Sequence, residues 1–328
     1  MQESVKRHVA LRMFFRRVAM ISLLMLFGWF VQDAHASSIS LDTAAVESSI
    51  VFIYPVLHNG TDADTEHPLG TGFLVWVPKK DKPGGYLLLI TARHILEPSW
   101  AHCDIPDPKA IFIRIEKKIN GASSAVGPLA YVPLQLVIKG EKKYFTSSNE
   151  QVDSAVLPID IYDTYPQKDY GWVPLEFHVF ASETEIKQLK IGDSVAAAGL
   201  VPGFEGHEKN YSFFKFGHIS SIFGEPFSTS CGPGVPAKSV RVWFIDANLL
   251  HGNSGAPILY FPQLGYTNDS PARAMLIGTQ SSALPVQQTG GMPAGLAAIT
   301  PIHFVAEIIE RMPYGDTPNL FRGIPTPK

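Results

Sequence analysis

The chain has 328 residues, of which 45% are apolar and 17% are charged, and its formal net charge is −3. This much apolar material builds one large domain or two small ones, and it excludes an intrinsically disordered chain. The small negative net charge gives no indication of the basic surface that nucleic-acid binding needs. Two cysteines exclude a disulfide-rich scaffold and a four-thiolate zinc site.

The first 36 residues have the three-part layout of a secretory signal peptide. Basic residues between Lys6 and Arg17 precede residues 18–31, which carry no charge, and Ala34-His35-Ala36 supplies a small-x-small cleavage pattern. The uncharged run is shorter than the roughly 20 residues that a membrane-spanning helix needs. We therefore predict export to the periplasm or the medium after cleavage near Ala36, with no stable membrane span afterwards. An uncleaved N-terminal anchor is the alternative.

An exported chain meets conditions in which a disulfide is stable. Cys103 and Cys231 both lie in stretches that contain proline or glycine. Sequence alone does not show that their Cβ atoms meet, so the paired and the free states both stay open.

Short runs of β-branched, aromatic and leucine residues recur along the chain, and turn residues bound each run. This pattern, with frequent Gly and Pro, is typical of an all-β sandwich or barrel. The predicted strands span residues 49–54, 72–77, 86–90, 111–115, 134–138, 194–198, 239–245, 256–260, 274–277 and 296–299. A helix is predicted over 180–189, around the capping-box pattern Ser182-x-x-Glu185, where a linker between two β halves would lie.

The last predicted element is an amphipathic helix over residues 301–312. Thr300 is its predicted N-cap and Pro301 its first helical residue. Apolar residues then recur on one face, and we interpret this stripe as core packing. They are Phe304, Val305, Ile308, Ile309 and Met312. Residues 313–328, which are rich in Pro and Gly, are predicted to form a tail.

Three short segments carry residues that together suit nucleophilic hydrolysis. His94 follows an apolar strand and a Thr-Ala step, Asp153 stands at the head of an apolar run, and Ser254 lies between glycines just before a strand. An imidazole can take the serine proton, a buried carboxylate can fix its tautomer, and backbone N–H groups of a glycine turn can stabilise an oxyanion. Each segment alone is more often structural. Their joint occurrence, separated by 59 and 101 residues, indicates a site between two β halves.

These segments, ITARHIL, VDSAVLPI and HGNSGAPI, resemble the three signatures of trypsin-like (chymotrypsin-fold) serine peptidases. The resemblance is strongest to bacterial HtrA/Deg-type and glutamyl-endopeptidase-type protease domains, and it extends loosely over residues 45–312. It implies a peptidase domain over residues 37–312, all-β, with two six-stranded antiparallel barrels at about 45–175 and 190–300 and a closing C-terminal helix. We do not expect the PDZ modules of the HtrA group after this helix.

The resemblance also implies roles for individual residues. Ser254 is the expected nucleophile, His94 the general base and then acid, and Asp153 the group that orients His94. The backbone N–H groups of Gly252 and Ser254 are the expected oxyanion hole. Asn253 stands where zymogen-activated members carry an Asp that pairs with a newly cut N-terminus, so activation by such a cut is not expected. The expected activity is that of a serine endopeptidase on polypeptides, with no cofactor or metal. The resemblance does not indicate an oligomeric state.

Substrate recognition is also implied by the resemblance. Asn248 is expected at the base of the pocket for the side chain before the scissile bond, Gly295 and Ala297 in its walls, and Ser281 offering backbone to the substrate. No carboxylate lies at the base and no histidine stands at Gln280. Small or medium uncharged side chains are therefore the expected preference.

Other functional classes fit the sequence less well. An α/β-hydrolase is excluded at motif level because position 256 is alanine and the chain order is wrong. The eleven histidines show no paired zinc-binding motif. His251, beside Ser254, either tunes substrate binding or is an exposed loop residue. The main alternative is a protease-fold binding protein of the cell envelope without turnover, and a third is an envelope structural protein with an uncleaved anchor.

Overall fold

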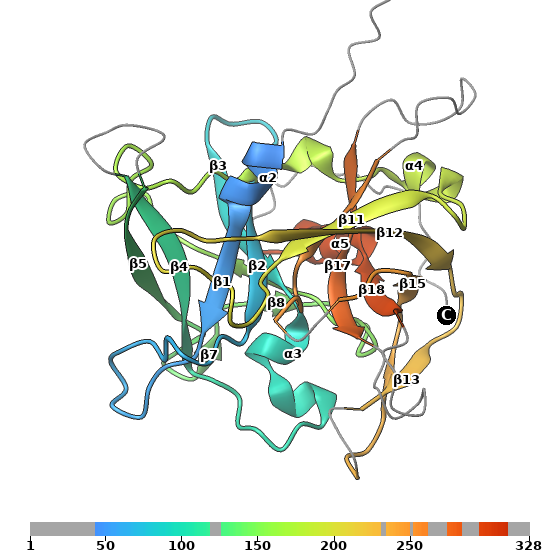
Figure 1. The fold of residues 1–328 in the computed structure, drawn as a ribbon, viewed down its shortest axis with the longest axis horizontal. Helices are drawn as coiled ribbons and strands as arrows, with labels where there is room; N and C mark the ends of the chain where they lie inside the picture. Colours follow the sequence, from blue (N-terminus) through green and yellow to red (C-terminus); the bar gives the residue numbers. More distant parts are fainter. Residues whose placement is uncertain are drawn as a thin grey trace, which may run out of the picture. The chain divides into compact units, whose positions relative to one another are not determined.

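The structure, a computed structural model, describes residues 43–118, 126–230, 234–249, 252–261, 274–283 and 295–313. The predicted signal peptide, the tail beyond residue 313, His251 and Cys231 lie outside these residues. The described chain is mostly β, with short helices between and after the strands (Figure 1). No helix within it is long and apolar enough to cross a membrane.

The first half of the described chain forms an open eight-stranded sheet. Its order is β5-β4-β1-β2-β3-β9-β8, and β10 pairs with β2. Neighbouring strands are antiparallel except for the parallel pair of β10 and β2. The strands are β1 (Ile50–Tyr54), β2 (Gly70–Pro78), β3 (Gly85–Thr91), β4 (Ala110–Lys118), β5 (Val126–Gln135), β8 (Phe145–Thr146), β9 (Ala155–Pro158) and β10 (Leu175–Glu176).

This open sheet corrects the six-stranded barrel expected for the first half. The two end strands, β5 and β8, do not pair with one another. Between them the chain forms a separate hairpin of β6 (Val137–Ile138) and β7 (Glu141–Lys142). Lys139 and Gly140 both have positive φ, 52° and 84°, as a two-residue type I′ turn requires. The chain between the two end strands thus forms its own hairpin, and the sheet stays open.

The second half forms a closed six-stranded barrel in the order β11-β12-β15-β18-β17-β16. This confirms the barrel predicted there, although β12 was not among the predicted strands and the run at 239–245 divides into β14 and β15. The barrel strands are β11 (Ser194–Gly199), β12 (Phe213–Ser221), β15 (Trp243–Ile245), β16 (Pro257–Tyr260), β17 (Met275–Ala283) and β18 (Ala297–Pro301). A small hairpin joins β13 (Phe227–Thr229) to β14 (Lys238–Val240).

The helices are short. They are α2 (Thr43–Ser49), α3 (Arg93–Leu96), α4 (Glu183–Gln188), α5 (Ile302–Glu310) and the 3₁₀ turns η1 (Pro98–Ala101) and η2 (Phe177–Val179). The capping box of α4 is confirmed, because the Glu185 N–H donates to the Ser182 hydroxyl. The predicted cap of α5 is wrong. Thr300 belongs to β18 and its hydroxyl donates to the Asp153 carbonyl at 3.2 Å, so α5 begins only after Pro301.

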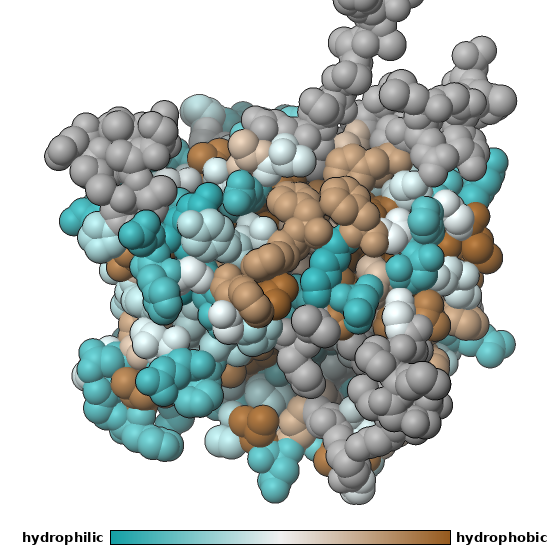
Figure 2. Space-filling view, viewed as in Figure 1, coloured by the Kyte–Doolittle hydropathy of each residue, from teal (hydrophilic) through white to brown (hydrophobic). Residues whose placement is uncertain are grey.

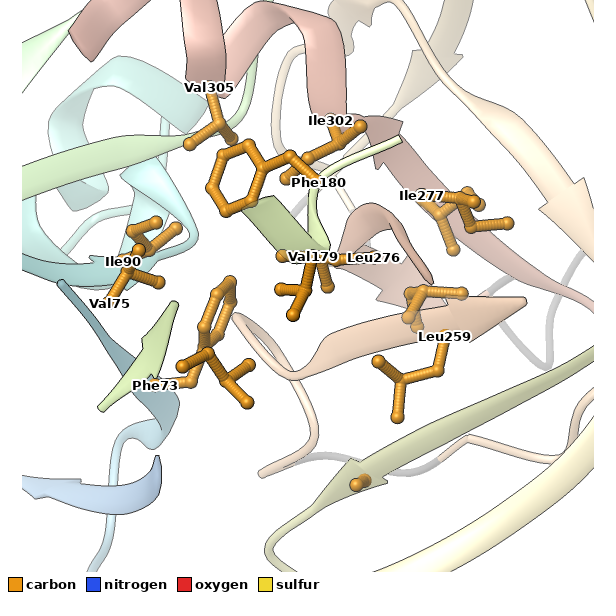
Figure 3. Close-up of a cluster of buried hydrophobic side chains, with 14 of the residues drawn as sticks. Phe73, Val75, Ile90, Val179, Phe180, Leu259, Leu276, Ile277, Ile302 and Val305 are labelled. Carbon is orange, nitrogen blue, oxygen red and sulfur yellow. The ribbon is translucent and has the colours of Figure 1, made fainter. Parts of the chain in front are cut away.

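One apolar core is shared by the open sheet and the barrel (Figure 3). Phe73 and Ile90 come from the sheet, Leu276 from the barrel, and Val305 from α5. Phe180, in the connection between the halves, is buried among them. The apolar stripe of α5 packs into this core, as predicted, although Phe304 is only half-buried. Burying each such side chain contributes roughly 1.5–3 kcal/mol, so the shared core holds the halves firmly together.

The surface mixes hydrophilic and hydrophobic residues, as the face in Figure 2 shows. Two exposed phenylalanines belong to β12, where Phe216 is 72% exposed and Phe213 is also exposed. These exposed aromatics break the usual alternation of apolar and polar residues, which is why the pattern did not predict this strand.

Cys103 forms a disulfide, and the described residues contain no free cysteine. The only other cysteine of the sequence is Cys231, which lies outside the described residues. Cys103 follows η1, close in sequence to the short helix that carries His94.

Candidate active site

His94 lies on α3, directly after the central strand β3. The ring is 26% exposed, so part of it remains open to solvent. The preceding residue, Arg93, is buried and pairs with Glu97 one helical turn later, with 2.7 Å between Nε and Oε2. The Arg93 guanidinium also lies over the Trp100 ring, 5.0 Å from its centroid. These contacts fix the single turn that presents the imidazole.

Asp153 lies two residues before β9, which pairs with β3 through Thr91 and Ala155. This pairing brings Asp153 to the end of β3 where His94 begins. Its carboxylate is 3% exposed and accepts three hydrogen bonds. Oδ1 accepts from the His94 backbone N–H at 3.0 Å. Oδ2 accepts from Nδ1 of His94 at 2.8 Å and from the Ser281 hydroxyl at 2.6 Å. With Nδ1 as the donor, Nε2 is left as the basic nitrogen of the ring.

Burial and ion pairing shift the pKa values of His94 and Asp153 in opposite directions. For His94, burial lowers the pKa, but the charge and hydrogen bond of Asp153 outweigh it and the pKa is raised. For Asp153, burial raises the pKa, but the charge of His94 and the hydrogen bonds from His94 and Ser281 outweigh it and the pKa is lowered. The carboxylate is thus held in its charged form, and the imidazole is a stronger base than an unperturbed histidine.

Ser254 lies in a tight turn that ends at β16 (Pro257–Tyr260). Gly252 and Gly255 have φ of +88° and +85°, a region that favours glycine. A Cβ at Gly255 would lie 2.1 Å from the Thr71 carbonyl oxygen and 3.0 Å from the Ala92 nitrogen. Only glycine therefore lets the serine turn lie against the end of β3, next to the helix of His94.

Thr71 of β2 ties the serine turn to both halves. Its N–H donates to the Ser254 carbonyl at 2.9 Å, and its hydroxyl donates to the Gly252 carbonyl at 2.7 Å. The same hydroxyl accepts from the Leu200 N–H at 3.0 Å. The side-chain amide of Asn253, fully buried, donates to the Leu200 carbonyl at 2.6 Å. Asn253 thus serves as an internal brace between the turn and the end of β11.

The Ser254 hydroxyl donates to the Ser281 carbonyl oxygen at 3.4 Å in this conformation. Among the described residues, no hydrogen bond joins Ser254 to His94, and the backbone N–H groups of Gly252 and Ser254 have no acceptor. The structure therefore brings His94, Asp153 and Ser281 into direct contact and sets the serine turn beside them. Within the described residues, both backbone donors of the turn remain open.

The residues predicted for substrate binding are placed as follows. Ser281 lies at the site. Its hydroxyl donates to the Asp153 carboxylate, and its carbonyl oxygen accepts from the Ser254 hydroxyl. Ala297 is buried in the barrel core. Gly295 has a positive φ of 65° just before β18, and Asn248 is exposed, its carbonyl accepting from Lys215 Nζ at 2.9 Å. No contact among the described residues joins Asn248 or Gly295 to Ser254, and their roles stay predictions.

Sequence reasoning missed two groups that the structure brings to the site. The Ser281 hydroxyl on Asp153 depends on the register of β17 with β18, which no local pattern encodes. Thr71 was noted only as part of the segment Gly70-Thr71-Gly72-Phe73, which resembles the peptidase family. Its hydrogen bonds to Gly252 and Leu200 could not be predicted, because they join residues more than 100 apart in the chain.

Two cavities are lined by other residues. A cavity of about 260 Å³ is lined by residues that include Glu47, Glu116 and Lys209, and another of about 440 Å³ includes Lys142 and Asp160. Neither includes His94, Asp153 or Ser254. The described part of the chain has no cluster of three or more His, Cys, Asp or Glu residues that could hold a metal ion.

No protein-family model matches the sequence, and no curated protein matches it either. Solved structures do match. The active form of the Rv3671c protease from M. tuberculosis is 16% identical over 86% of this chain and 87% of that chain, with a TM-score of 0.44. The HtrA-type protease AlgW with a tripeptide is 15% identical over 84% and 64%, with a TM-score of 0.43. The MamO protease domain from Magnetospirillum magneticum is 12% identical over 80% and 96%, with a TM-score of 0.43. All three of these structures are proteases or protease domains, one of them of HtrA type, and each is at most 16% identical to this chain.

Proposed function

We propose that the chain is a serine endopeptidase that cleaves polypeptides through an acyl-enzyme on Ser254. One observation carries the proposal. The buried Asp153 carboxylate accepts both N–H groups of His94, which fixes the ring and leaves Nε2 as the free base. A general base of this kind is what a serine hydroxyl needs to attack an amide near neutral pH.

The reaction follows from the positions of these groups. Ser254 Oγ attacks the substrate carbonyl carbon while His94 Nε2 takes the hydroxyl proton. The resulting oxyanion accepts hydrogen bonds from the open N–H groups of Gly252 and Ser254, each worth roughly 10²–10³ in rate. The C–N bond then breaks, and the imidazolium of His94 gives its proton to the leaving amine.

Hydrolysis of the acyl-enzyme repeats these steps with water as the nucleophile. His94 takes a proton from water as its oxygen attacks the ester carbon, and the proton then returns to Ser254 as the acid product leaves. Asp153 stays ionised throughout, because its three hydrogen-bond donors and the adjacent imidazolium all favour the carboxylate.

A second candidate function is a non-catalytic binding protein of the cell envelope. The observation that favours it is the direction of the Ser254 hydroxyl, which donates to the Ser281 carbonyl. A catalytic serine must instead present this hydroxyl to His94, so turnover requires a different rotamer of Ser254 when substrate is bound.

Cleavage of an unstructured protein and of a peptide library separates the two candidates. We expect the wild-type chain to cleave both, and Ser254→Ala and His94→Ala each to lose about 10³-fold or more of the rate. Ser220→Ala is the matched control, since Ser220 is a partly buried serine of β12 remote in sequence from the turn, and it is expected to keep the rate. A folded wild-type chain whose cleavage is no faster than that of Ser254→Ala would favour the binding protein.

Export after cleavage near Ala36 is part of the same proposal. The disulfide at Cys103 supports it, because such bonds persist in oxidising compartments and are rare in the cytosol. N-terminal sequencing of the protein recovered outside the cytosol is expected to begin at residue 37. An intact N-terminus on all of the exported protein would instead support an uncleaved anchor.

A further inference from the structure

The inner face of β12 carries one charged side chain, Lys215. Ile219 of the same strand is buried in the shared core and pairs with Ile245. Because side chains alternate along a strand, Lys215 lies on the same face as Ile219. Directly opposite Lys215 on β11 is Ala197, which is also buried in this core. Lys215 therefore extends from the barrel's inner wall, beside a small residue that leaves it room.

Within the part of the chain that the structure describes, the ammonium group of Lys215 has no counter-ion. It donates to one acceptor, the Asn248 carbonyl oxygen at 2.9 Å, although it carries three N–H donors. Within the described residues no carboxylate lies at ion-pair distance from it. The nearest charged group along the loop, Asp246, accepts instead from the backbone N–H and ring of His218. Burial lowers the pKa of Lys215, and no negative charge offsets that effect. A half-buried cation in this state is stabilised by an incoming anion.

The same inner face borders the serine turn. Gly199 lies two residues after Ala197 on β11, and so it shares that face at a spacing of roughly 7 Å. A Cβ at Gly199 would lie 2.9 Å from the Ala256 Cβ and 3.2 Å from the Asn253 amide nitrogen. These are the residues on either side of Ser254 and Gly255. Lys215 therefore lies on the inner face of the strand pair β11 and β12, whose end at Gly199 borders the serine turn.

A second polar side chain, that of Gln280, lies on the inner face of β17, across the barrel from β12, and its amide oxygen has no partner among the described residues. Gln280 is 1% exposed and pairs with Ile299, a core residue, so its side chain lies on the inner face. Its Oε1 atom is buried and makes no hydrogen bond. Its backbone meanwhile holds the serine turn, accepting from Gly255 at 2.8 Å and donating to Ala256 at 2.9 Å. A buried amide oxygen without a donor is costly, and rotating the amide plane lets the NH₂ group donate to an anion at that position.

We infer that Lys215 and Gln280 recognise an acidic side chain, Glu or Asp, on the substrate residue whose carbonyl carbon Ser254 attacks. This inference rests on the proposed peptidase function, and it replaces the uncharged preference expected from sequence. A substrate carboxylate supplies the missing counter-ion to Lys215 and the missing partner of the Gln280 amide. The sequence motifs contained no sign of this, because Lys215 lies on β12, far from them.

The test uses fluorogenic peptides that differ only in the residue before the scissile bond: Glu, Gln, Asp, Asn, Leu and Lys. We expect the full chain to cleave the Glu peptide with a kcat/KM about tenfold or more above that of its isosteric Gln partner, from the charge-assisted bonds alone. Lys215→Gln is expected to remove this ratio, and Lys215→Glu to reverse it in favour of the Lys peptide. Lys187→Gln is the matched control, because Lys187 is on α4 and pairs with Glu183, and it is expected to keep the wild-type ratio.

The outcomes separate this inference from the proposed function. Thermal unfolding shows whether each Lys215 variant is folded, and the reversed preference of Lys215→Glu cannot arise from misfolding. If the wild-type chain cleaves after uncharged or basic residues and Lys215→Gln leaves that preference unchanged, the inference is overturned while the peptidase stands. If no peptide is cleaved and a fluorophosphonate does not label Ser254, both are overturned. Labelling of Ser254 without cleavage of any acidic peptide overturns the inference alone.

Discussion

Replacing Asp153 with asparagine tests the hydrogen-bonded core of the site with almost no change in volume. The carboxylate accepts three donors, two from His94 and one from Ser281. An asparagine has only one oxygen to accept them, and its NH₂ group meets a donor wherever it replaces Oδ2. To bond that NH₂ group, the His94 ring must place its proton on Nε2 and accept on Nδ1. The general base is then blocked.

The expected loss follows from the wrong tautomer. A blocked base lowers kcat by roughly 10⁴-fold, which corresponds to about 5 kcal/mol in activation free energy. The pH profile should change as well. Activity needs neutral His94, and its pKa is raised by the Asp153 charge, so wild-type activity falls as pH drops through a pKa above the usual value. Without that charge the pKa falls, and the acid limb of Asp153→Asn moves to lower pH.

The assay is single-turnover acylation with an activated ester, measured from pH 5 to pH 9. Ser281→Ala is the comparison variant, because it removes one donor to Asp153 and leaves both bonds to His94. It should lose about tenfold, the effect of one hydrogen bond to a charged group. If Asp153→Asn acylates within tenfold of wild type with an unmoved acid limb, Asp153 does not orient the base and the argument fails.

Three further predictions concern the frame around the site. Gly255→Ala should abolish cleavage and destabilise the fold by well over 1 kcal/mol in urea unfolding, because its Cβ meets the Thr71 carbonyl. Gly84→Ala is the control: it has a similar positive φ but open space, so it should cost only about 1 kcal/mol, and equal losses would refute the packing argument. Thr71→Val removes the hydroxyl that bonds Gly252 and should lower kcat about tenfold or more with a smaller change in KM; an unchanged kcat would show that the brace is dispensable. Burial lowers the pKa of His303 to about 4, below its unfolded value of 6.5, so its contribution to stability is present above pH 6.5 and is lost as pH falls towards 4. Between pH 7 and pH 5 this loss is at most about 2 kcal/mol, and His303→Leu should show a correspondingly flatter pH dependence of stability in urea unfolding; an unchanged slope would contradict it.

The sequence predicted the parts of this protein that local chemistry encodes. The strand-His94 segment, the Asp153 segment and the glycine turn around Ser254 each carry a recognisable local pattern, and the second barrel followed from short apolar runs between turns. The capping box of α4 is likewise a local signal, since Ser182 and Glu185 are three residues apart.

What the sequence did not predict depends on distant pairing. Closure of the first sheet depends on whether its end strands β5 and β8 pair, and they do not; the chain between them forms the hairpin around Lys139 and Gly140. Thr300 has the residue type of an N-cap, but it lies in β18, where it pairs with Thr279 of β17, and its hydroxyl donates to the Asp153 carbonyl. Lys215 lies on a strand whose exposed phenylalanines conceal the alternation. In each case tertiary contacts outweigh local propensity.

The central claim is that Ser254 becomes a nucleophile through His94 and Asp153. The most direct measurement is intact-mass analysis and peptide mapping of the folded chain after treatment with a fluorophosphonate. A single adduct is predicted on Ser254, formed in the wild-type chain, absent in Ser254→Ala and strongly slowed in His94→Ala. A folded wild-type chain that gains no adduct, or that gains it equally fast without His94, would contradict the claim.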